Sequence, residues 1–367
     1  MSTATCNHDF ASPVGETEVP QGEHPKSPRQ SARFCGLSCD QDSFSTIDMA
    51  EKDQLFTLEN VPGKGKGLIA SQSIPKGTCI ISEPPLFTTD ALEDPNNIEK
   101  DLGRIVRSLP KEGQRAFLSL HNNNPGSDPF SNIVRSNGYP LGPSSDVGGI
   151  FPLVARINHS CLPNAQHAWS DKHQKMLVHA VRDIEPGCEL TLSYIAGGPS
   201  TERRSNIKTY FGFDCSCELC SLGPEARKIS DERLQKAQKL DEAIGDPKRV
   251  RYMPDRALAD CRQLLSIYES EQVMDLRLPR LYYDALQICG MHSDQARVCV
   301  FAQRSRDARI LCEGKDSCEA AALEKLVSKP SSFENFGVTK NWKSTVGEIP
   351  KDVGEVEFEQ WLWRVKN

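Results

Sequence analysis

The stretch that decides the fold is Asn158-His159-Ser160-Cys161-Leu162-Pro163-Asn164-Ala165. A buried Asn-His pair often serves only as a hydrogen-bonded element of a core, so this stretch alone leaves a purely structural role open. Further along comes Glu189-Leu190-Thr191-Leu192-Ser193-Tyr194, which by itself fits an alternating strand with a tyrosine packed at its end. The order in which these and two other segments follow one another is more informative than any one of them.

A cluster of cysteines follows. Three of the 14 cysteines lie in Cys215-Ser216-Cys217-Glu218-Leu219-Cys220. This spacing places three thiolates close enough to bind one ion, and because zinc takes four ligands, a fourth would come from elsewhere. Glu218 fits that position poorly, since soft thiolate sites favour further sulfur. The alternative is three unrelated cysteines in a loop, and Cys35 with Cys39 makes a weaker zinc signal because no second pair accompanies it.

A glycine-rich turn, Gly63-Lys64-Gly65-Lys66-Gly67, follows a predicted strand at 55–58. Alternate glycines between strands usually serve a hairpin that needs positive φ. The functional alternative is a close approach of the backbone to a ligand, with Lys64 and Lys66 supplying positive charge. It is not a phosphate-binding loop, because neither a helix nor Gly-Lys-Ser/Thr follows.

The composition excludes several classes of protein. The 367 residues include 44 basic and 50 acidic side chains, for a net charge of −6. Without a surplus of Lys and Arg to displace counterions, we expect no direct nucleic-acid binding. No run of 18 apolar residues and no signal peptide is present, so we expect no membrane partner. Fourteen cysteines in a small secreted chain would indicate disulfides, but the length and the missing signal peptide favour the nucleus, the cytoplasm or both.

Composition and periodicity predict four parts. Residues 1–52 are expected to be disordered, because residues 1–50 hold only nine Val, Ile, Leu, Met or Phe. Residues 53–199 are expected to form a domain of short strands with an inserted helical region at about 90–150. Residues 200–224 hold the cysteines, and residues 225–367 are expected to form a helical domain, for which tetratricopeptide-like repeats are an option although no clean self-similarity is present.

Within these parts, periodicity predicts individual elements. Apolar residues at helical spacing predict a helix between 96 and 120, and the density of Asn, Gly, Pro and Ser predicts a loop over 122–149. One or two helical turns are expected at 151–157. Strands are expected at 78–82, 166–169, 176–181 and 189–194, and helices at 201–209, 257–270, 279–289 and 294–311. The aromatic residues of 358–363 are expected to dock on the helical domain.

Four motifs therefore occur in order: Gly-x-Gly, Asn-His-Ser-Cys-x-Pro-Asn, Glu-Leu-Thr-x-x-Tyr and Cys-x-Cys-x-x-Cys. Over about residues 55–222 the chain thereby resembles the SET-domain lysine methyltransferases, and most of all their SMYD-like subgroup. The resemblance implies an α+β fold with a β-rich core of short strands, in which the Asn-His-Ser and Glu-Leu-Thr segments form a pseudoknot. It also implies inserted helices, a zinc-bound post-SET segment and an all-α C-terminal domain. S-adenosyl-L-methionine would be the methyl donor, and one Zn²⁺ would be structural.

The resemblance also implies roles for single residues. Lys64, Gly65 and Lys66 would line the pocket of the methyl donor largely through backbone atoms, with Phe213 at its border. Asn158 and His159 would hold the amino-acid and adenine ends of the donor. Tyr194 would be the catalytic residue, touching the donor and orienting the substrate amine. The channel for the substrate lysine would be lined by Tyr210, Phe211 and Phe213. The zinc ligands would be Cys161, Cys215, Cys217 and Cys220.

The implied chemistry needs no carboxylate base. A free lysine has a pKa of about 10.4, but desolvation in an aromatic channel and a neighbouring sulfonium both favour the neutral amine. Two features depart from the subgroup. Residues 84–150 contain no cysteine, so the inserted MYND zinc finger is absent, and Phe211 stands where members tend to carry a Tyr, which bears on the degree of methylation.

The expected partner is a protein or peptide that carries a lysine, either a histone or a non-histone protein, acted on by a monomer. The acidic net charge would attract basic tails, although net charge says nothing of the groove itself. The alternative is a catalytically inactive SET-like scaffold that binds partners through its C-terminal helices. Retention of Asn158, His159 and Tyr194 favours the enzyme.

Overall fold

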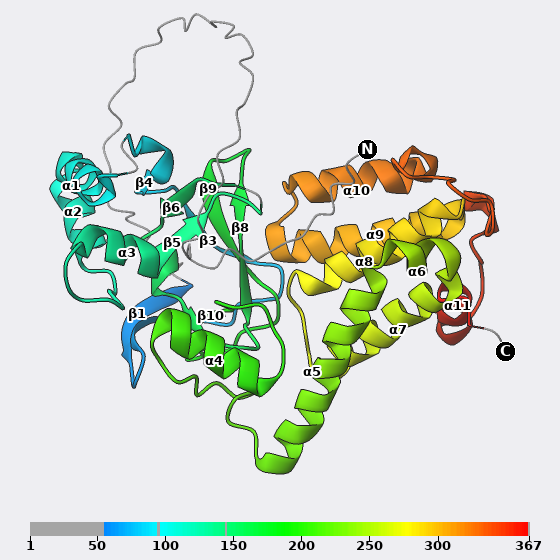
Figure 1. Cartoon of the computed structure of the whole chain (residues 1–367), viewed down its shortest axis with the longest axis horizontal. Coiled ribbons are helices and arrows are strands. Elements are labelled where there is room, and N and C mark those ends of the chain that lie inside the picture. The colour runs from blue at the N-terminus through cyan, green and yellow to red at the C-terminus, as the bar shows by residue number, and fades with distance from the viewer. Residues whose placement is uncertain (1–54, 94–95, 144, 366–367) are drawn as a thin grey trace, which may run out of the picture.

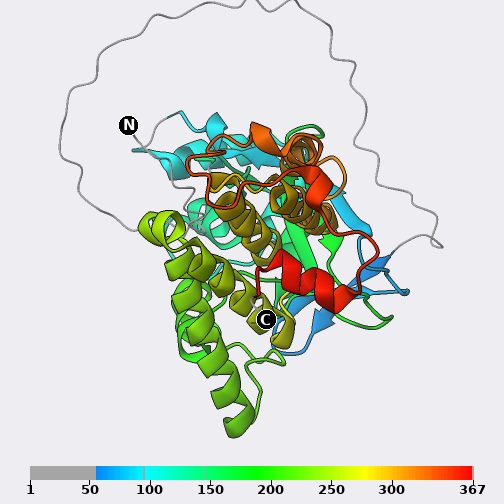
Figure 2. The same cartoon turned by 90° about the vertical axis from the view of Figure 1, so that its right-hand side faces the viewer.

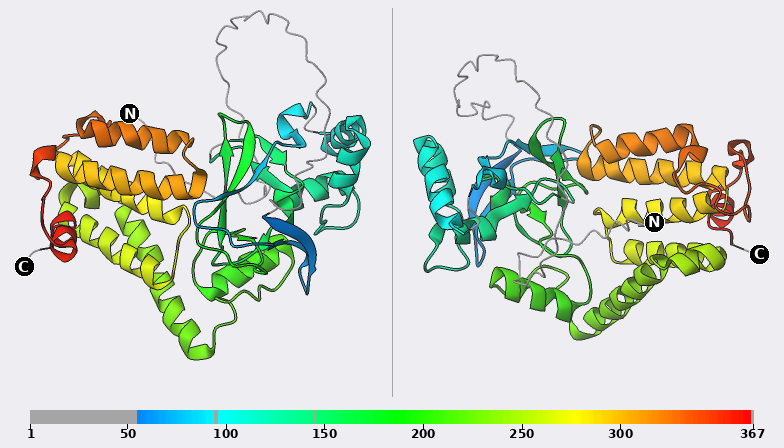
Figure 3. Two further views of the ribbon diagram at one scale, coloured as in Figure 1. Left: turned by 180° about the vertical axis from the view of Figure 1, so that it is seen from behind. Right: turned by 45° about the horizontal axis from the view of Figure 1, so that its top comes forward.

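The structure, a computed structural model, describes residues 55–93, 96–143 and 145–365. The disordered segment predicted for 1–52, with Cys35 and Cys39, lies outside the described residues. Figure 1 shows a region of short strands beside a region of helices, and the helical C-terminal region and the mixed α+β class are thereby confirmed. Two further directions of view show the same arrangement, with α5 (Pro224–Ile244) leading from one region to the other (Figure 3).

The strand region is built from short segments. The strands are β1 (Phe56–Val61), β2 (Gly65–Ala70), β3 (Cys79–Glu83), β4 (Phe87–Thr88), β5 (Gly138–Pro140), β6 (Gly148–Ile150), β7 (Asn158–His159), β8 (Ala165–Ser170), β9 (Lys175–Ala180) and β10 (Thr191–Leu192). They form two three-stranded sheets, β3-β9-β8 and β4-β6-β5, an antiparallel β1-β2 hairpin, and a parallel β7-β10 pair. The predicted strand at 189–194 thus shortens to two residues.

The core of this region lies on one face of the β3-β9-β8 sheet. Alternate residues of β9, Met176, Val178 and Ala180, point into it, as the period of two in a strand requires. The residue between the last two, His179, takes the other face, where it packs against Gly314 at the C-terminal end of α9 (Gln295–Glu313). The sheet is therefore covered by its own core on one side and by the helical region on the other.

The inserted helices cover the flank of the strand region that is far from the C-terminal helices (Figure 1). The helix predicted between 96 and 120 is split into α1 (Ile98–Ser108) and α2 (Lys111–Leu118) at Pro110, which lacks the N–H that a continuous helix needs. Both helices pack on a small core that includes Phe87, Phe117 and Ile150.

The loop predicted over 122–149 is wrong, because α3 (Pro129–Asn137), β5 and β6 lie within it. The polar side chains that led to the loop prediction form hydrogen bonds with backbone groups of an ordered segment. Asn132 Nδ2 donates to the carbonyls of Asn124 and Ser127, and the Glu99 carboxylate accepts the backbone N–H groups of Phe130 and Ser131. A helix end needs such acceptors, and here α1 supplies one from a distant part of the sequence.

The C-terminal region is helical from Pro224 onward. Its helices are α5, α6 (Pro247–Tyr252), α7 (Pro254–Ser270), α8 (Arg277–Met291), α9, α10 (Cys318–Ser328) and α11 (Glu355–Leu362), and α4 (Ser200–Phe211) precedes them. Figure 2 shows this region from its outer side. The expected docking of the closing aromatic residues is confirmed, since Trp363 is buried with its ring 4.8 Å from that of Phe301. None of the described helices combines the length and apolarity that crossing a bilayer requires.

The Glu83 carboxylate holds the start of the short helix that precedes the Asn158 stretch. Glu83, at the end of β3, accepts the backbone N–H groups of Leu153 and Val154 at 2.8–3.1 Å, at the start of the short 3₁₀ helix η2 (Val154–Arg156). This helix is what remains of the one or two turns predicted at 151–157. Burial raises the pKa of Glu83 to about 7. The carboxyl is therefore protonated more readily in the folded protein than in the unfolded chain.

We predict that Glu83 makes the folded protein less stable as the pH rises. Since its folded pKa of about 7 lies above its ordinary value of 4.5, the folded state holds the extra proton between these values, and its contribution to the unfolding free energy is lost as the pH rises through about 7. In Glu83→Gln that part of the pH dependence should vanish. Chemical denaturation at several pH values checks this, and parallel curves for the two proteins would contradict it.

Candidate active site

The Asn158 and Tyr194 segments, far apart in sequence, lie side by side. β7 and β10 pair in parallel, with Asn158 opposite Thr191 and His159 opposite Leu192. Beyond the pair, the Ser160 N–H donates to the Leu192 carbonyl at 2.9 Å. This pairing is the contact between the two segments that the predicted pseudoknot requires.

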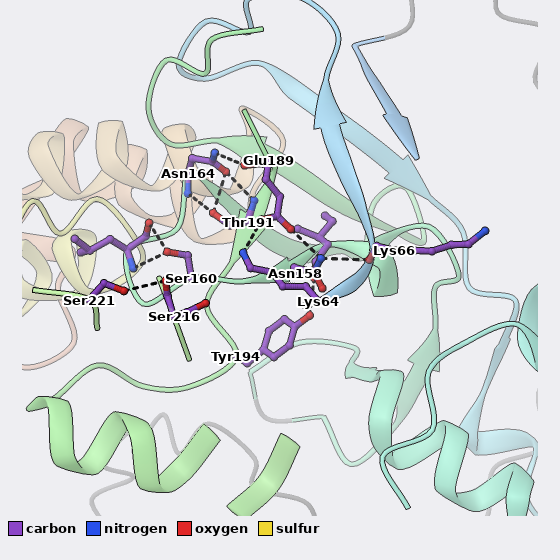
Figure 4. Close-up of polar contacts among 12 residues, drawn as sticks. Lys64, Lys66, Asn158, Ser160, Asn164, Glu189, Thr191, Tyr194, Ser216 and Ser221 are labelled. Carbon is purple, nitrogen blue, oxygen red and sulfur yellow. Dashed lines mark hydrogen bonds and ion pairs between the residues drawn. The ribbon is translucent and has the colours of Figure 1, made fainter. Parts of the chain in front are cut away.

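The side chain of Asn164 fixes the pairing from the other side. Its Nδ2 donates to the Glu189 carbonyl at 2.9 Å, and its Oδ1 accepts the Thr191 N–H at 2.8 Å (Figure 4). The same residue thus bonds both flanks of Leu190, which is fully buried. Asparagine suits this position because its amide carries a donor and an acceptor on one short side chain.

Glu189 joins the glycine turn to the Asn158 stretch. Its carboxylate accepts from Asn158 Nδ2 at 2.8 Å with one oxygen and pairs with Lys64 Nζ at 2.6 Å with the other. Asn158 Nδ2 also donates to the Lys66 carbonyl at 3.2 Å, while the Lys66 side chain extends away from the site (Figure 4). No sequence pattern gives Glu189 a role of its own. Lys64 and Glu189 are 125 positions apart and share no periodicity, so only the fold could reveal the pair.

Two positions of the turn require glycine, each for a different reason. Gly65 has φ +78°, a left-handed conformation that favours glycine. Gly67 has an ordinary φ, but a Cβ there would lie 2.7 Å from Asn158 Nδ2 and 2.7 Å from Val61 Cγ2. The turn therefore approaches Asn158 closely, so two segments that were predicted to line one pocket lie together.

Tyr194 lies two residues after the end of β10 and is half-buried. Its hydroxyl donates to the Ile157 carbonyl at 2.6 Å. Burial raises the pKa of Tyr194, so the phenol keeps its proton at neutral pH. Its ring lies 4.9 Å from that of Phe211 and 5.2 Å from that of His159. The hydroxyl is thus held in one place by the backbone just before Asn158, and its oxygen lone pairs remain able to accept.

His159 turns its imidazole toward the protein. Only 3% of the residue is exposed, and its Nδ1 accepts the Tyr194 N–H at 3.1 Å. Burial lowers the pKa of His159 to about 4, so the ring is neutral. With Nδ1 used as the acceptor, Nε2 carries the hydrogen and points at Cys161 Sγ, 3.3 Å away. Both ring nitrogens are engaged, so contact with a ligand would fall to the His159 backbone.

Four cysteines converge behind His159. The Sγ atoms of Cys161, Cys215, Cys217 and Cys220 all lie within 4.8 Å of one another, and those of Cys161 and Cys220 are 3.6 Å apart. All four residues are buried, and none forms a disulfide. Hydrogen bonds among the four sulfurs lower the pKa of Cys217, and lower that of Cys220 to about 6, whereas the pKa values of Cys161 and Cys215 are raised. Two of the sulfurs therefore favour the thiolate form that binds metal, and the other two act as thiol donors to them.

The three residues predicted to line the lysine channel, Tyr210, Phe211 and Phe213, differ in how close they lie to Tyr194 and His159. Phe211 is partly buried against the cysteine cluster and Tyr194, and the ring of Phe213, whose residue is 37% exposed, lies 6.3 Å from that of His159. Tyr210 is 42% exposed, and within the described part of the chain no ring contact joins it to Tyr194. The structure thus brings Phe211 and Phe213 to the site and leaves Tyr210 at its surface.

Comparison with known proteins agrees with this geometry. The sequence profile described as SET domain matches residues 65–195. Histone-lysine N-methyltransferase set5 of Schizosaccharomyces pombe is 35% identical over 282 residues, which are 76% of this chain and 85% of that protein. Histone-lysine N-methyltransferase SMYD3 of Homo sapiens is 29% identical over 36% of this chain and 31% of its own length. N-lysine methyltransferase SMYD2 of Homo sapiens is 27% identical over 51% and 48%.

We predict that Gly67→Ala disrupts the site. The atoms that its Cβ would meet belong to Val61 and to Asn158, whose amide is already bonded to Glu189, so they cannot all move away freely. We expect the unfolding free energy to fall by about 1–3 kcal/mol, as in other overpacked positions. Chemical denaturation measures this, with Gly126→Ala as the control because a Cβ there meets nothing within 4 Å. Equal stability of the two variants would contradict the close approach.

Proposed function

The chain belongs to the SET-domain family of protein-lysine methyltransferases, and from that premise we propose which residues carry the reaction and what they act on. Members transfer a methyl group from S-adenosyl-L-methionine to the side-chain amine of a lysine, and this is the activity of the chain. The observation that carries the assignment of residues is the β7-β10 pairing, which sets the Tyr194 hydroxyl beside the backbone that leads into Asn158.

The methyl donor would lie between the glycine turn and Asn158. The backbone of Lys64, Gly65 and Lys66 forms one side, and the Asn158 amide and the His159 backbone form the other. The fit is supported by the close approach at Gly67 and by polar groups that carry both signs, the Lys64 ammonium and the Glu189 carboxylate. An amino-acid carboxylate would be matched by Lys64 and an ammonium by Glu189. The donor supplies a methyl group made electrophilic by its sulfonium.

The remaining work is alignment, because methyl transfer to a neutral amine requires little covalent chemistry from the protein. The Tyr194 hydroxyl, fixed on the Ile157 carbonyl, would orient the substrate amine through its oxygen lone pairs. Phe211, with Phe213 and Tyr210 nearer the surface, would form the walls of the lysine channel. An apolar channel raises the cost of the ammonium form and so favours loss of the proton to solvent before transfer.

The four cysteines would bind one structural Zn²⁺. In a tetrahedral site with Zn–S distances of about 2.3 Å the sulfurs lie about 3.8 Å apart, so sulfurs within 4.8 Å of one another need only a small contraction. His159 would then donate its Nε2 hydrogen to a zinc-bound thiolate, and its Nδ1 would hold the Tyr194 backbone. The ion would thereby stabilise the part of the site that positions Tyr194.

The substrate would be a histone or another protein with an accessible lysine, met in the nucleus, the cytoplasm or both. Two of the relatives are named histone-lysine methyltransferases, and the net charge of −6 favours a basic partner. The proposed division of the chain keeps the SET domain at 53–199, the zinc-bound segment at 200–224 and the helical domain from 225, acting as a monomer.

We predict that Tyr194→Phe reduces methyl transfer at least about 100-fold, because the amine loses the oxygen that orients it. The assay follows labelled methyl from S-adenosyl-L-methionine into core histones and into a random peptide library with a central lysine. Tyr252→Phe is the matched control, since this residue is 72% exposed and lies on α6, away from the site. Equal activity of Tyr194→Phe and wild type would refute the assigned role.

We predict that the purified protein contains one zinc ion per chain and that Cys161→Ser loses it. The loss follows because a serine oxygen is a poor replacement for thiolate in a soft site. Elemental analysis measures the zinc, and the melting temperature should fall with chelator and recover with added Zn²⁺. Cys188→Ser, at an exposed cysteine, should keep the ion. Zinc in Cys161→Ser at the wild-type level, or none in wild type, would count against the site.

A further inference from the structure

Two adjacent glycines lie in the segment 195–199, which joins Tyr194 to α4. Gly198 has φ +108°, a left-handed conformation that favours glycine, whereas Gly197 has no such angle. Neither residue has a side chain that could restrict the backbone, so a glycine pair keeps one conformation only where contacts from other parts of the fold hold it. The segment that follows the proposed catalytic residue therefore depends on such contacts.

One of these contacts comes from the helical region. A Cβ built on Gly197 would overlap Nη1 of Arg277, the first residue of α8, and would lie 3.2 Å from its Cζ. The three nearest atoms that such a Cβ would meet all belong to Arg277. The guanidinium thus lies in the space that a side chain at position 197 would take, and this close approach is what requires glycine there.

The guanidinium is fixed where it contacts the segment. Arg277 Nε donates to Asp275 Oδ1 at 2.9 Å, and Nη2 donates to Asp275 Oδ2 at 2.7 Å. The backbone N–H of Arg277 also donates to Oδ1, at 3.0 Å, and Asp275 is buried. Such a bidentate pair holds the plane of the guanidinium in one orientation, with Nη1 directed at Gly197.

The two ends of the segment are held by other groups. At its start, the Tyr194 N–H donates to His159 Nδ1 at 3.1 Å, and the Ile195 side chain is buried. Near its end, the Gly198 carbonyl accepts from Nη1 of Arg203, a residue that is only 2% exposed. Freedom of movement is therefore left only to the middle of the segment.

The middle has no comparable bonds. Ala196 is exposed, and within the described part of the chain neither Ala196 nor Gly197 forms a hydrogen bond. The Arg277 guanidinium is thus the group that restrains Gly197, only three residues from Tyr194. A side chain of the helical region thereby limits how far the end of the catalytic segment can move.

We propose that Arg277 is a positioning residue for methyl transfer, which restrains Gly197 and so keeps the Tyr194 hydroxyl where it orients the substrate amine. The inference rests on the role proposed for Tyr194 and gives the helical region a part in the reaction. Without Arg277 the segment gains freedom, and the hydroxyl moves over a wider range about the Ile157 carbonyl. The proposed donor pocket, between the glycine turn and Asn158, includes no part of this segment, so donor binding should change little.

The test measures the apparent kcat on core histones and on a random peptide library with a central lysine, and the KM for S-adenosyl-L-methionine. Arg277→Ala removes the contact but leaves the buried Asp275 without its partner, which by itself lowers stability. Asp275→Asn/Arg277→Ala therefore accompanies it, because an amide leaves no uncompensated charge. Arg280→Ala is the matched control, since Arg280 lies on the same helix and pairs with Asp241 of the helical region. Zinc content and melting temperature are measured for every protein.

We expect the apparent kcat to fall about tenfold in both Arg277 variants, with the KM for the donor within about twofold of wild type, because alignment is lost and binding is not. Zinc content should be unchanged, and Arg280→Ala should keep the wild-type kcat. A role of Arg277 in stability alone would lower the melting temperature and leave the kcat of the folded protein as it is.

A second pair of variants tests the contact itself. Gly197→Ala sets a methyl group against the fixed guanidinium and should also lower the kcat about tenfold. In Gly197→Ala/Arg277→Ala the methyl group enters the vacated space, and alanine has less backbone freedom than glycine. The double variant should therefore be at least about threefold more active than either single variant, whereas independent effects would multiply.

A wild-type kcat in Arg277→Ala, or losses that multiply in the double variant, would overturn this inference while the proposed function stands. A raised KM for S-adenosyl-L-methionine at an unchanged kcat would place the effect at the donor pocket and also overturn it. If wild type transfers no methyl group, or if Tyr194→Phe keeps full activity, the proposed function or the role of Tyr194 fails, and this inference with it.

Discussion

Two residue pairs between β7 and β10 are the constraint on which the rest of the site depends. These strands are too short to hold together alone, and the surrounding bonds compensate: Ser160 bonds the Leu192 carbonyl, and Asn164 bonds both Glu189 and Thr191. Leu190 and Leu192, fully or almost fully buried, anchor the same segment in the core. Because Asn158 and Tyr194 lie at this pairing, an error in its register by one residue would move both away from the site.

The pairing also connects the two ends of the site. On one side, Glu189 ties the pair to the glycine turn through Asn158 and Lys64. On the other side, His159 ties it to the cysteine cluster, with one ring nitrogen on the Tyr194 backbone and the other on Cys161. The neutral imidazole can do both only because it is buried with a donor on one side and an acceptor on the other. The proposed donor pocket, Tyr194 as the proposed catalytic residue and the proposed zinc site thus form one hydrogen-bonded unit.

Much of the fold and many of the candidate site residues could be predicted from the sequence. The features that could not be predicted have physical reasons. The motifs at 158–164, 189–194 and 215–220 have fixed spacing, so their residues could be named in advance, as could most C-terminal helices. The 122–149 segment was misjudged because its Asn and Ser side chains bond the backbone of an ordered helix, an arrangement that depends on Glu99 from another helix. Glu189 was missed because its importance lies in a contact with Lys64, 125 positions away in the sequence, that no local pattern encodes.

The central claim is that the glycine turn, Asn158 and Glu189 together make a pocket for the methyl donor. Calorimetric titration of S-adenosyl-L-methionine into the zinc-replete protein tests it most directly, with Asn158→Ala as the variant that removes the shared amide. The account predicts saturable binding of one donor per chain in wild type, and binding weakened at least about tenfold in Asn158→Ala, the loss expected for a hydrogen bond to a charged group. No binding by wild type, or equal binding by both proteins, would contradict it.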